Sequence, residues 1–186
     1  MENKDFSFTE ENLAKANAQF AKYPENKRQS NVKALLYLAQ DQNNGWLSIE
    51  AMNYVAELIG VPPIKVYEVA SFYTMFNLKP VGKFVVKVCK TTPCMLRGSD
   101  DLVDHCLKKL NIEIGRTTID KLFTIKKVEC LGACANAPVV QINNDYYEDL
   151  TVESFEKLLD NLAKGKPIKS GSQIGRHSSE PFQEAL

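Results

Sequence analysis

Hydrophobic residues in the first part of the chain recur at the spacing of amphipathic helices. Leu13 and Ala16 lie at i and i+3, which places them on one helical face. Another helix is expected to begin after Ser48, a good N-cap residue, and to end at Gly60. Four such helices joined by short links predict a small helical bundle over residues 1–80. The other core positions that we assign to these helices are Phe20, Val32, Leu35, Leu36, Ala39, Met52, Val55, Ala56, Ile59, Val66, Val69, Phe72 and Phe76.

The pattern then changes from helical spacing to short β-branched runs. Phe84–Val88 has the composition of a strand that stops at Cys89, and a second strand, Phe123–Glu129, stops at Cys130. Between these strands, Ser99 is expected to cap a helix. The remaining expected elements are a strand at Val139–Ile142, a hairpin turn at Asn143–Asp145 and a final helix over Thr151–Ala163.

This order of elements fits a small α/β sandwich of thioredoxin type over residues 81–164. From Lys164 onward the chain is rich in Lys, Gly, Ser and Pro and has no hydrophobic periodicity. We therefore expect residues 165–186 to form an extended tail after the two domains.

Charge and apolar content exclude several classes of protein. The 186 residues include 23 basic and 23 acidic side chains, a balance that argues against binding nucleic acid. No apolar stretch approaches the roughly 20 residues that span a bilayer, so no direct membrane insertion is expected. The N-terminus, MENKDFSFTEEN, lacks the basic and apolar regions of a secretory signal. We expect a reducing compartment, where close cysteine pairs bind metal or do redox work more often than they form disulfides.

The cysteines carry the main chemical information. Four of the five form two close pairs, Cys89 with Cys94 and Cys130 with Cys134, and 35 residues separate the pairs. Each pair comes directly after a predicted strand, so both loops would meet at one edge of the sheet if the strands were parallel. A site of four thiolates suits a metal ion or an iron–sulfur cluster.

Spacing alone leaves the nature of this site open. The spacers of four and three residues match neither the plant-type nor the bacterial ferredoxin pattern, so a 2Fe–2S cluster, zinc and thiol redox chemistry all remain. A thiol–disulfide enzyme normally places C-x-x-C at a helix start, and the sequence contains no C-x-x-C. We expect Cys106 to be a buried structural thiol, His105 to lie on the surface and His177 to lie in the tail.

Both cysteine loops resemble those of a known family. VCKTTPCMLRGSD and VECLGACANAPVVQINNDYYEDLT are similar to the cluster loops of the thioredoxin-like 2Fe–2S subunit of respiratory complex I, the E-subunit family of NADH-quinone oxidoreductase. GWLSIEAMNYVAELIGVPPIKVYEVASFYTMF resembles the family's docking bundle, and PIKSGSQIGRHSSEP resembles the tail of alphaproteobacterial and mitochondrial members. The resemblance covers residues 6–181, and the tail departs from the family pattern after Pro181.

The resemblance implies a mixed α/β architecture, in which an N-terminal helical bundle precedes a thioredoxin-like 2Fe–2S ferredoxin domain. It also implies that Cys89, Cys94, Cys130 and Cys134 ligate one 2Fe–2S cluster. The implied partners are the subunit that binds NADH and FMN and a neighbouring iron–sulfur subunit. The chain itself has no G-x-G-x-x-G fingerprint, so we expect neither nucleotide, and no complete active site, on this chain.

Two alternatives to this function remain open. The first is the equivalent diaphorase subunit of an NAD-dependent hydrogenase or formate dehydrogenase, and the second is a zinc-bound structural or adaptor protein. The family implies that the chain lies on the cytoplasmic side of the bacterial inner membrane, or on the matrix side in an organelle. It would be a peripheral subunit, attached to the membrane only through the rest of the complex. The helical bundle is expected to bind the flavoprotein subunit, and the tail is expected to lie along neighbouring subunits.

Overall fold

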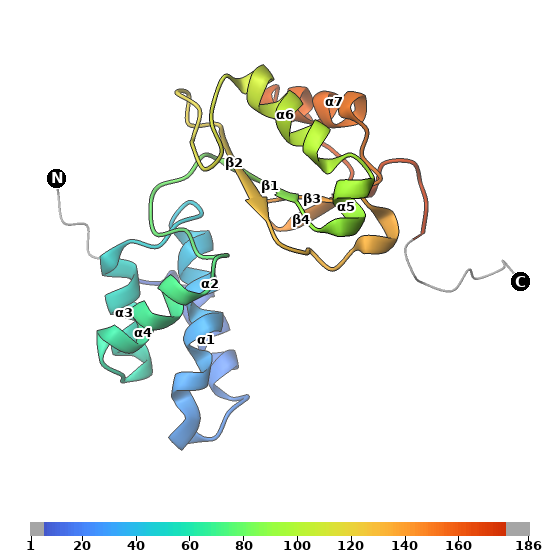
Figure 1. Ribbon diagram of the computed structural model, residues 1–186. Helices are drawn as coiled ribbons and strands as arrows, with labels where there is room; N and C mark the ends of the chain where they lie inside the picture. Colours follow the sequence, from blue (N-terminus) through green and yellow to red (C-terminus); the bar gives the residue numbers. More distant parts are fainter. Residues whose placement is uncertain (1–5, 178–186) are drawn as a thin grey trace, which may run out of the picture. The chain divides into compact units, whose positions relative to one another are not determined.

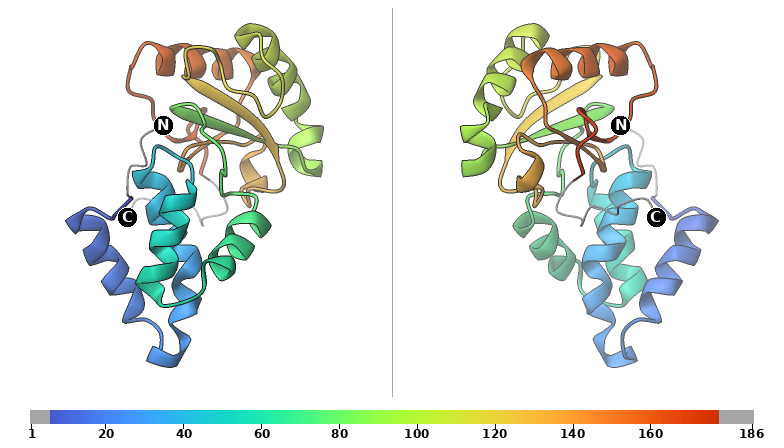
Figure 2. Two further views of the ribbon diagram at one scale, coloured as in Figure 1. Left: turned by 90° about the vertical axis from the view of Figure 1, so that its left-hand side faces the viewer. Right: turned by 90° about the vertical axis from the view of Figure 1, so that its right-hand side faces the viewer.

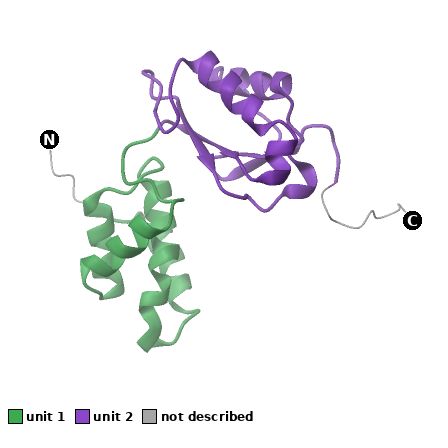
Figure 3. Ribbon diagram, viewed as in Figure 1, with its two compact units in different colours: residues 1–81 green, residues 82–186 purple. Residues whose placement is uncertain are grey.

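The structure is a computed structural model that describes residues 6–177 and divides the chain into two units, residues 1–81 and 82–186 (Figures 1 and 3). Each unit has its own hydrophobic core. The end of the predicted tail, residues 178–186, lies outside the described residues. Within the described part, no helix is both long enough and apolar enough to cross a bilayer.

The first unit is helical, as its hydrophobic spacing predicts. Its elements are α1 (Glu10–Phe20), a 3₁₀ helix η1 (Glu25–Asn31), α2 (Val32–Gln42), α3 (Ile49–Ile59) and α4 (Pro63–Phe72). Ser48 caps α3, because its hydroxyl accepts a hydrogen bond from the Ala51 N–H at 3.1 Å. Gly60 ends the same helix with φ of +81°, a left-handed conformation that suits glycine. Both predicted ends of α3 are confirmed.

The core of this unit contains most of the predicted positions, including the fully buried Leu35, Leu36, Val55 and Val66. Each fully buried Leu or Val contributes about 1.5–3 kcal/mol to stability. Two predicted positions are exposed instead: Leu13 is 37% exposed and Phe72 is 77% exposed, so their assignment to the core was wrong. Ala70 and Val66 form the buried stripe of α4, and a residue two positions after Ala70 is turned roughly 200° away from it.

The second unit is a five-stranded mixed sheet with helices packed on it. The strands, in the order β2-β1-β3-β4-β5 across the sheet, are β2 (Phe123–Val128), β1 (Phe84–Cys89), β3 (Val140–Ile142), β4 (Asp145–Glu148) and β5 (Gly171–Ser172). The helices are α5 (Thr92–Leu96), α6 (Ser99–Leu110), the 3₁₀ helix η2 (Cys134–Asn136) and α7 (Val152–Ala163). β1 pairs parallel with β2 and antiparallel with β3.

α6 and α7 lie side by side in all views and share one core with the sheet (Figures 1 and 2). Val86 and Val88 of β1 face this core, together with Leu102 of α6 and Phe155 of α7. Successive strand residues point to opposite faces, so Cys89 belongs to a separate small cluster. The predicted mixed α/β architecture, with a helical N-terminal part, is confirmed.

Two local predictions in this unit have different outcomes. The hairpin is confirmed: Asn143 adopts φ of +53° between β3 and β4, and its side-chain carbonyl accepts from the Val85 N–H at 2.9 Å. The Ser99 cap was wrong. Gly98, with φ of +92°, occupies the N-cap position of α6, and Ser99 is its first helical residue. The buried Ser99 hydroxyl has no hydrogen-bond partner among the described residues.

The tail contains structure that the absence of periodicity did not predict. β5 pairs parallel with β4, with Gly171 opposite Tyr147 and Ser172 opposite Glu148. Gly171 and Ser172 of the tail therefore form an edge strand of the sheet.

Candidate functional site: two cysteine loops at one sheet edge

The parallel pairing of β1 and β2 brings the two cysteine loops together, as the sequence predicts. Cys89 is the last residue of β1 and stands opposite Val128, the last residue of β2. Cys130 follows two residues later. The Lys90 N–H donates to the Val128 carbonyl at 3.0 Å and continues the pairing past the end of β1. Both loops therefore begin at the carboxyl edge of the same strand pair.

The first loop contains a helix that the sequence analysis did not predict. α5 begins after Thr91 and has a proline in its first turn. Proline is tolerated there, because the N–H that it lacks would not take part in helical hydrogen bonding. This helix carries Cys94, which is buried like Cys89. The Thr91 hydroxyl lies 3.3 Å from Cys89 Sγ.

The second loop exposes both of its cysteines. Cys130 Sγ and Cys134 Sγ lie 3.5 Å apart, and the Gly132 N–H donates to Cys130 Sγ at 3.4 Å. Gly132 has φ of +83°, a left-handed conformation that is unfavourable for other residues. The Tyr146 hydroxyl on β4 donates to the Leu131 carbonyl at 2.9 Å and fixes the loop to the sheet.

The four thiols influence one another's ionisation. Burial, followed by the hydrogen bond with Cys89, raises the pKa of Cys94 to about 12. Burial is the largest influence on the pKa of Cys89 and acts to raise it, but hydrogen bonds with the Thr91 hydroxyl and backbone, the Leu131 backbone and Cys94 together outweigh it, and the pKa is lowered. The Gly132 N–H lowers the pKa of Cys130, and the hydrogen bond with Cys130 raises that of Cys134. Negative charge on Cys89 acts to raise the pKa of both Cys130 and Cys134, so the two loops influence each other's ionisation.

These residues fit an iron–sulfur cluster by their chemistry. Four cysteine thiolates are the usual ligand set of a 2Fe–2S cluster, which spreads its ligands over two irons. Four thiolates also suit one zinc ion, with Zn–S distances of about 2.3 Å, so the donor set alone does not distinguish the two centres. Within residues 6–177, no three Cys, His, Asp or Glu side chains are grouped to hold one metal ion.

The remaining candidates are Cys106, His105 and His177. Cys106 is fully buried in the core under α6, and burial raises its pKa to about 12, which confirms the predicted structural thiol. His105 is half-buried on α6, with Nε2 3.5 Å from a Glu156 carboxylate oxygen of α7. His177 is the last described residue of the tail.

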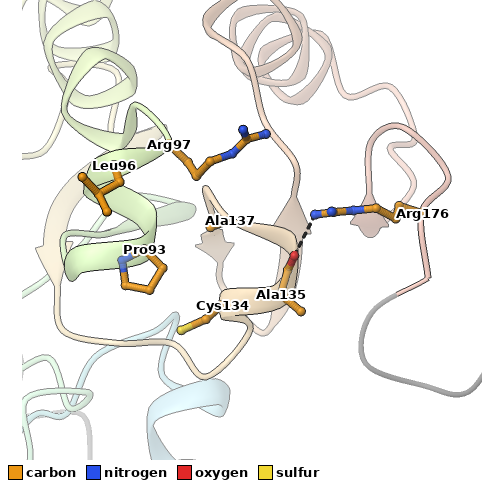
Figure 4. Close-up of a pocket in the computed structure, with 7 residues that line it drawn as sticks. All are labelled: Pro93, Leu96, Arg97, Cys134, Ala135, Ala137 and Arg176. Atoms are coloured by element: carbon orange, nitrogen blue, oxygen red, sulfur yellow. Dashed lines mark hydrogen bonds between the residues drawn. The ribbon is translucent and has the colours of Figure 1, made fainter.

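A cavity of about 430 Å³ borders the second loop (Figure 4). In Figure 4, Arg97, which directly follows α5, and Arg176 from the tail point toward it from different elements. Arg176 Nη2 donates to the Ala135 carbonyl at 2.7 Å, one residue after Cys134. Arg176 was not among the predicted site residues, because the tail has no pattern that singles it out.

A mixed sheet with two flanking helices and two cysteine loops at the end of a parallel strand pair defines an iron–sulfur protein of the thioredoxin-like class. Residues 16–163 match the model of the thioredoxin-like [2Fe-2S] ferredoxin family. The chain belongs to this family. Membership confirms the expected thioredoxin-like fold and the expected cofactor, one 2Fe–2S cluster.

Curated relatives agree with the resemblance seen in the cysteine loops. The chain is 52% identical over 179 residues to the mitochondrial NADH dehydrogenase [ubiquinone] flavoprotein 2 of Dictyostelium discoideum, covering 96% of this chain and 72% of the relative. It is 54% identical over 158 residues to the E subunit of the NADH-quinone oxidoreductase of Rickettsia conorii, covering 85% and 95%. The predicted resemblance to the E-subunit family is confirmed.

The fold also occurs in a solved NAD+-reducing [NiFe]-hydrogenase in the H2-reduced state. The TM-score is 0.64 at 21% identity, and the match covers 74% of this chain and 23% of the hydrogenase chain. At this identity the similarity concerns the fold alone.

Proposed function

We propose that this chain is an electron-transferring subunit of an NADH:quinone oxidoreductase and holds one 2Fe–2S cluster on Cys89, Cys94, Cys130 and Cys134. The names of relatives more than half identical to the chain confirm the subunit function predicted from the sequence. The observation that carries the ligand assignment is the parallel pairing of β1 with β2, which delivers both cysteine loops to one sheet edge.

The cluster supplies a one-electron redox centre when bound, and the residues of the two loops set its environment. The Thr91 hydroxyl and the Gly132 N–H each lie within 3.4 Å of a cysteine sulfur and stabilise negative charge there. Because reduction adds negative charge, these donors favour the reduced state and raise the reduction potential. Buried Cys89 and Cys94 keep one side of the site away from water.

The relatives' names imply assembly into a multi-subunit oxidoreductase. We infer that the direct partner is the subunit that binds NADH and FMN, with an iron–sulfur subunit nearby, on the cytoplasmic side of a bacterial inner membrane or the matrix side in an organelle. The helical unit is the proposed docking domain. The exposed apolar residues of this unit include Ile49, Ile64 and Phe72, which are available to contact a partner.

The diaphorase subunit of a hydrogenase is the second candidate, and the shared fold of the [NiFe]-hydrogenase favours it. The identity of 21% to that chain is far below the 54% to the oxidoreductase E subunit, which favours the respiratory enzyme. Co-purification separates these candidates, because the tagged chain would capture the subunits of only one of these complexes.

One purification tests the cluster itself. We expect a reddish-brown protein that contains two irons and two acid-labile sulfides per chain, as a 2Fe–2S centre requires, and that gives an electron paramagnetic signal on reduction. A colourless protein with one zinc per chain would contradict the proposed function and restore the zinc-bound adaptor alternative.

A further inference from the structure

The tail returns to the loop that carries Cys134. After β5 pairs with β4, Arg176 donates through Nη2 to the Ala135 carbonyl at 2.7 Å and also pairs with the Asp149 carboxylate. A residue of the tail therefore contacts the backbone directly beside a cysteine of the candidate cluster site (Figure 4).

Asp149 makes this contact a specific one. Its side chain is only 3% exposed, whereas that of Arg176 is 47% exposed. The carboxylate also accepts from the Ser172 hydroxyl at 2.7 Å, and the same hydroxyl accepts from the Arg176 N–H at 3.1 Å. A buried carboxylate needs charged or hydrogen-bonding partners, and Arg176 supplies the positive one.

The short helix η2 is fixed from a second direction. The Asp149 N–H donates to the Asn136 carbonyl at 2.8 Å, and the Asn136 amide donates to a Glu148 carboxylate oxygen at 2.7 Å. Of the three residues in η2, Ala135 is therefore held by the tail, and Asn136 is held by Glu148 of β4 and by Asp149. The third residue is Cys134, whose direction depends on these two anchors.

We propose that Arg176 is a positioning residue for the cluster site: by bridging the Asp149 carboxylate and the Ala135 carbonyl, it fixes the direction of Cys134. The inference rests on the proposed role of Cys134 as a ligand. The planar guanidinium suits the task, because it presents several N–H donors in a fixed geometry. Contacts that orient metal ligands typically change metal affinity by about 10–100-fold when they are removed.

Arg97 provides a matched control. It lines the same cavity from the end of α5, so its loss removes an equal charge close to the same loop. Its side chain has no hydrogen bond or ion pair within residues 6–177 and does not hold the Ala135 carbonyl. A purely electrostatic effect would appear in both Arg97→Gln and Arg176→Gln, whereas a positioning effect would appear in Arg176→Gln alone.

The test compares cluster-loaded full-length wild type, Arg176→Gln and Arg97→Gln. Cluster loss to a strong iron chelator is followed by visible absorbance, the reduced cluster by electron paramagnetic resonance, and the backbone of residues 133–137 by hydrogen exchange. Circular dichroism and urea unfolding check the fold. For Arg176→Gln we expect about tenfold faster cluster loss, a broadened paramagnetic signal and faster exchange in 133–137. Arg97→Gln should match wild type in all three.

Equal behaviour of Arg176→Gln and Arg97→Gln, or unchanged exchange in residues 133–137, would overturn the positioning role. A Cys134→Ala variant separates this failure from failure of the proposed function. If Cys134→Ala loses the normal cluster while the two arginine variants are alike, only the role of Arg176 is wrong. If Cys134→Ala keeps the wild-type cluster spectrum, the ligand assignment fails, and the role of Arg176 fails with it.

Discussion

Cys89 Sγ lies 3.3 Å from Thr91 Oγ1, inside a loop whose two cysteines are buried. When Cys89 is a thiolate, the hydroxyl can only donate, so this contact places a proton beside a negative sulfur. Burial opposes ionisation of Cys89, and the hydrogen bonds from Thr91 are the largest of the contributions that together lower its pKa.

Thr91→Val should therefore lower the reduction potential of the cluster. A hydrogen bond contributes about 1 kcal/mol, and ~59 mV corresponds to a tenfold change for one electron, so we expect a shift on the order of 40 mV. The measurement is a redox titration followed by electron paramagnetic resonance. Thr92→Val is the control, since the Thr92 hydroxyl has no hydrogen bond to a cysteine in the described chain. Equal potentials of the two variants would contradict the role of Thr91.

The cluster-free protein should show ordered thiol reactivity. Cys130 is exposed and the Gly132 N–H lowers its pKa, so it should react first with iodoacetamide as the pH rises toward neutrality. Burial raises the pKa of Cys94 to about 12, so it should react last among the four. Mass spectrometry of alkylated peptides over a pH series measures this order. Faster labelling of Cys94 than of Cys130 would be incompatible with it.

Cys106 should make the protein less stable at alkaline pH. Its folded-state pKa is raised to about 12 from an ordinary value of 9.0, so the folded state retains a proton that the unfolded state loses. The contribution of this thiol is fully present below pH 9.0 and falls by about 1.4 kcal/mol per pH unit as the pH rises toward 12.

Urea unfolding of wild type and Cys106→Ala at several pH values isolates this contribution, because other titrating groups are common to both proteins. The free-energy difference between the two proteins should shrink or reverse above pH 9.0. A difference that stays constant from neutral to strongly alkaline pH would show that Cys106 does not act in this way.

Alanine substitutions at two apolar positions of the helical unit should change the free energy of unfolding by very different amounts. Leu35→Ala removes a fully buried side chain and should lower the free energy of unfolding by about 2–5 kcal/mol. Phe72→Ala removes a largely exposed one and should change it by less than about 0.5 kcal/mol. Chemical denaturation measures both, and a large loss for Phe72→Ala would mean that its ring packs in the core after all.

The sequence predicted those features that depend on neighbouring residues along the chain. Ser48 and Gly60 bound their helix as expected, and Asn143 forms the expected hairpin turn, because caps and turns are local hydrogen-bonding patterns. The edge where Cys89 and Cys130 meet was also predictable, because β-branched runs ending in cysteine mark two strand ends. The two cysteine loops were expected to meet at this edge only if the two strands were parallel, and β1 and β2 do pair in parallel.

Features that depend on contacts between distant residues were not predictable in this way. Arg176 and Asp149 are 27 residues apart, and neither belongs to a periodic pattern, so nothing in the sequence marks them as an ion pair. α5 was missed because five residues are too few for hydrophobic periodicity to appear. Phe72 misled because it lies three residues after Val69, a helical spacing that suits a buried stripe, whereas the buried stripe of α4 consists of Val66 and Ala70.

Single cysteine substitutions decide whether the two loops together hold one 2Fe–2S cluster. Cys94→Ala and Cys134→Ala, one from each loop, should both abolish the normal visible and paramagnetic spectra. Cys106→Ala should retain them, since its thiol lies in the separate core beneath α6. An unchanged cluster spectrum in Cys94→Ala or Cys134→Ala would contradict the assignment of that cysteine as a ligand and with it the four-cysteine site.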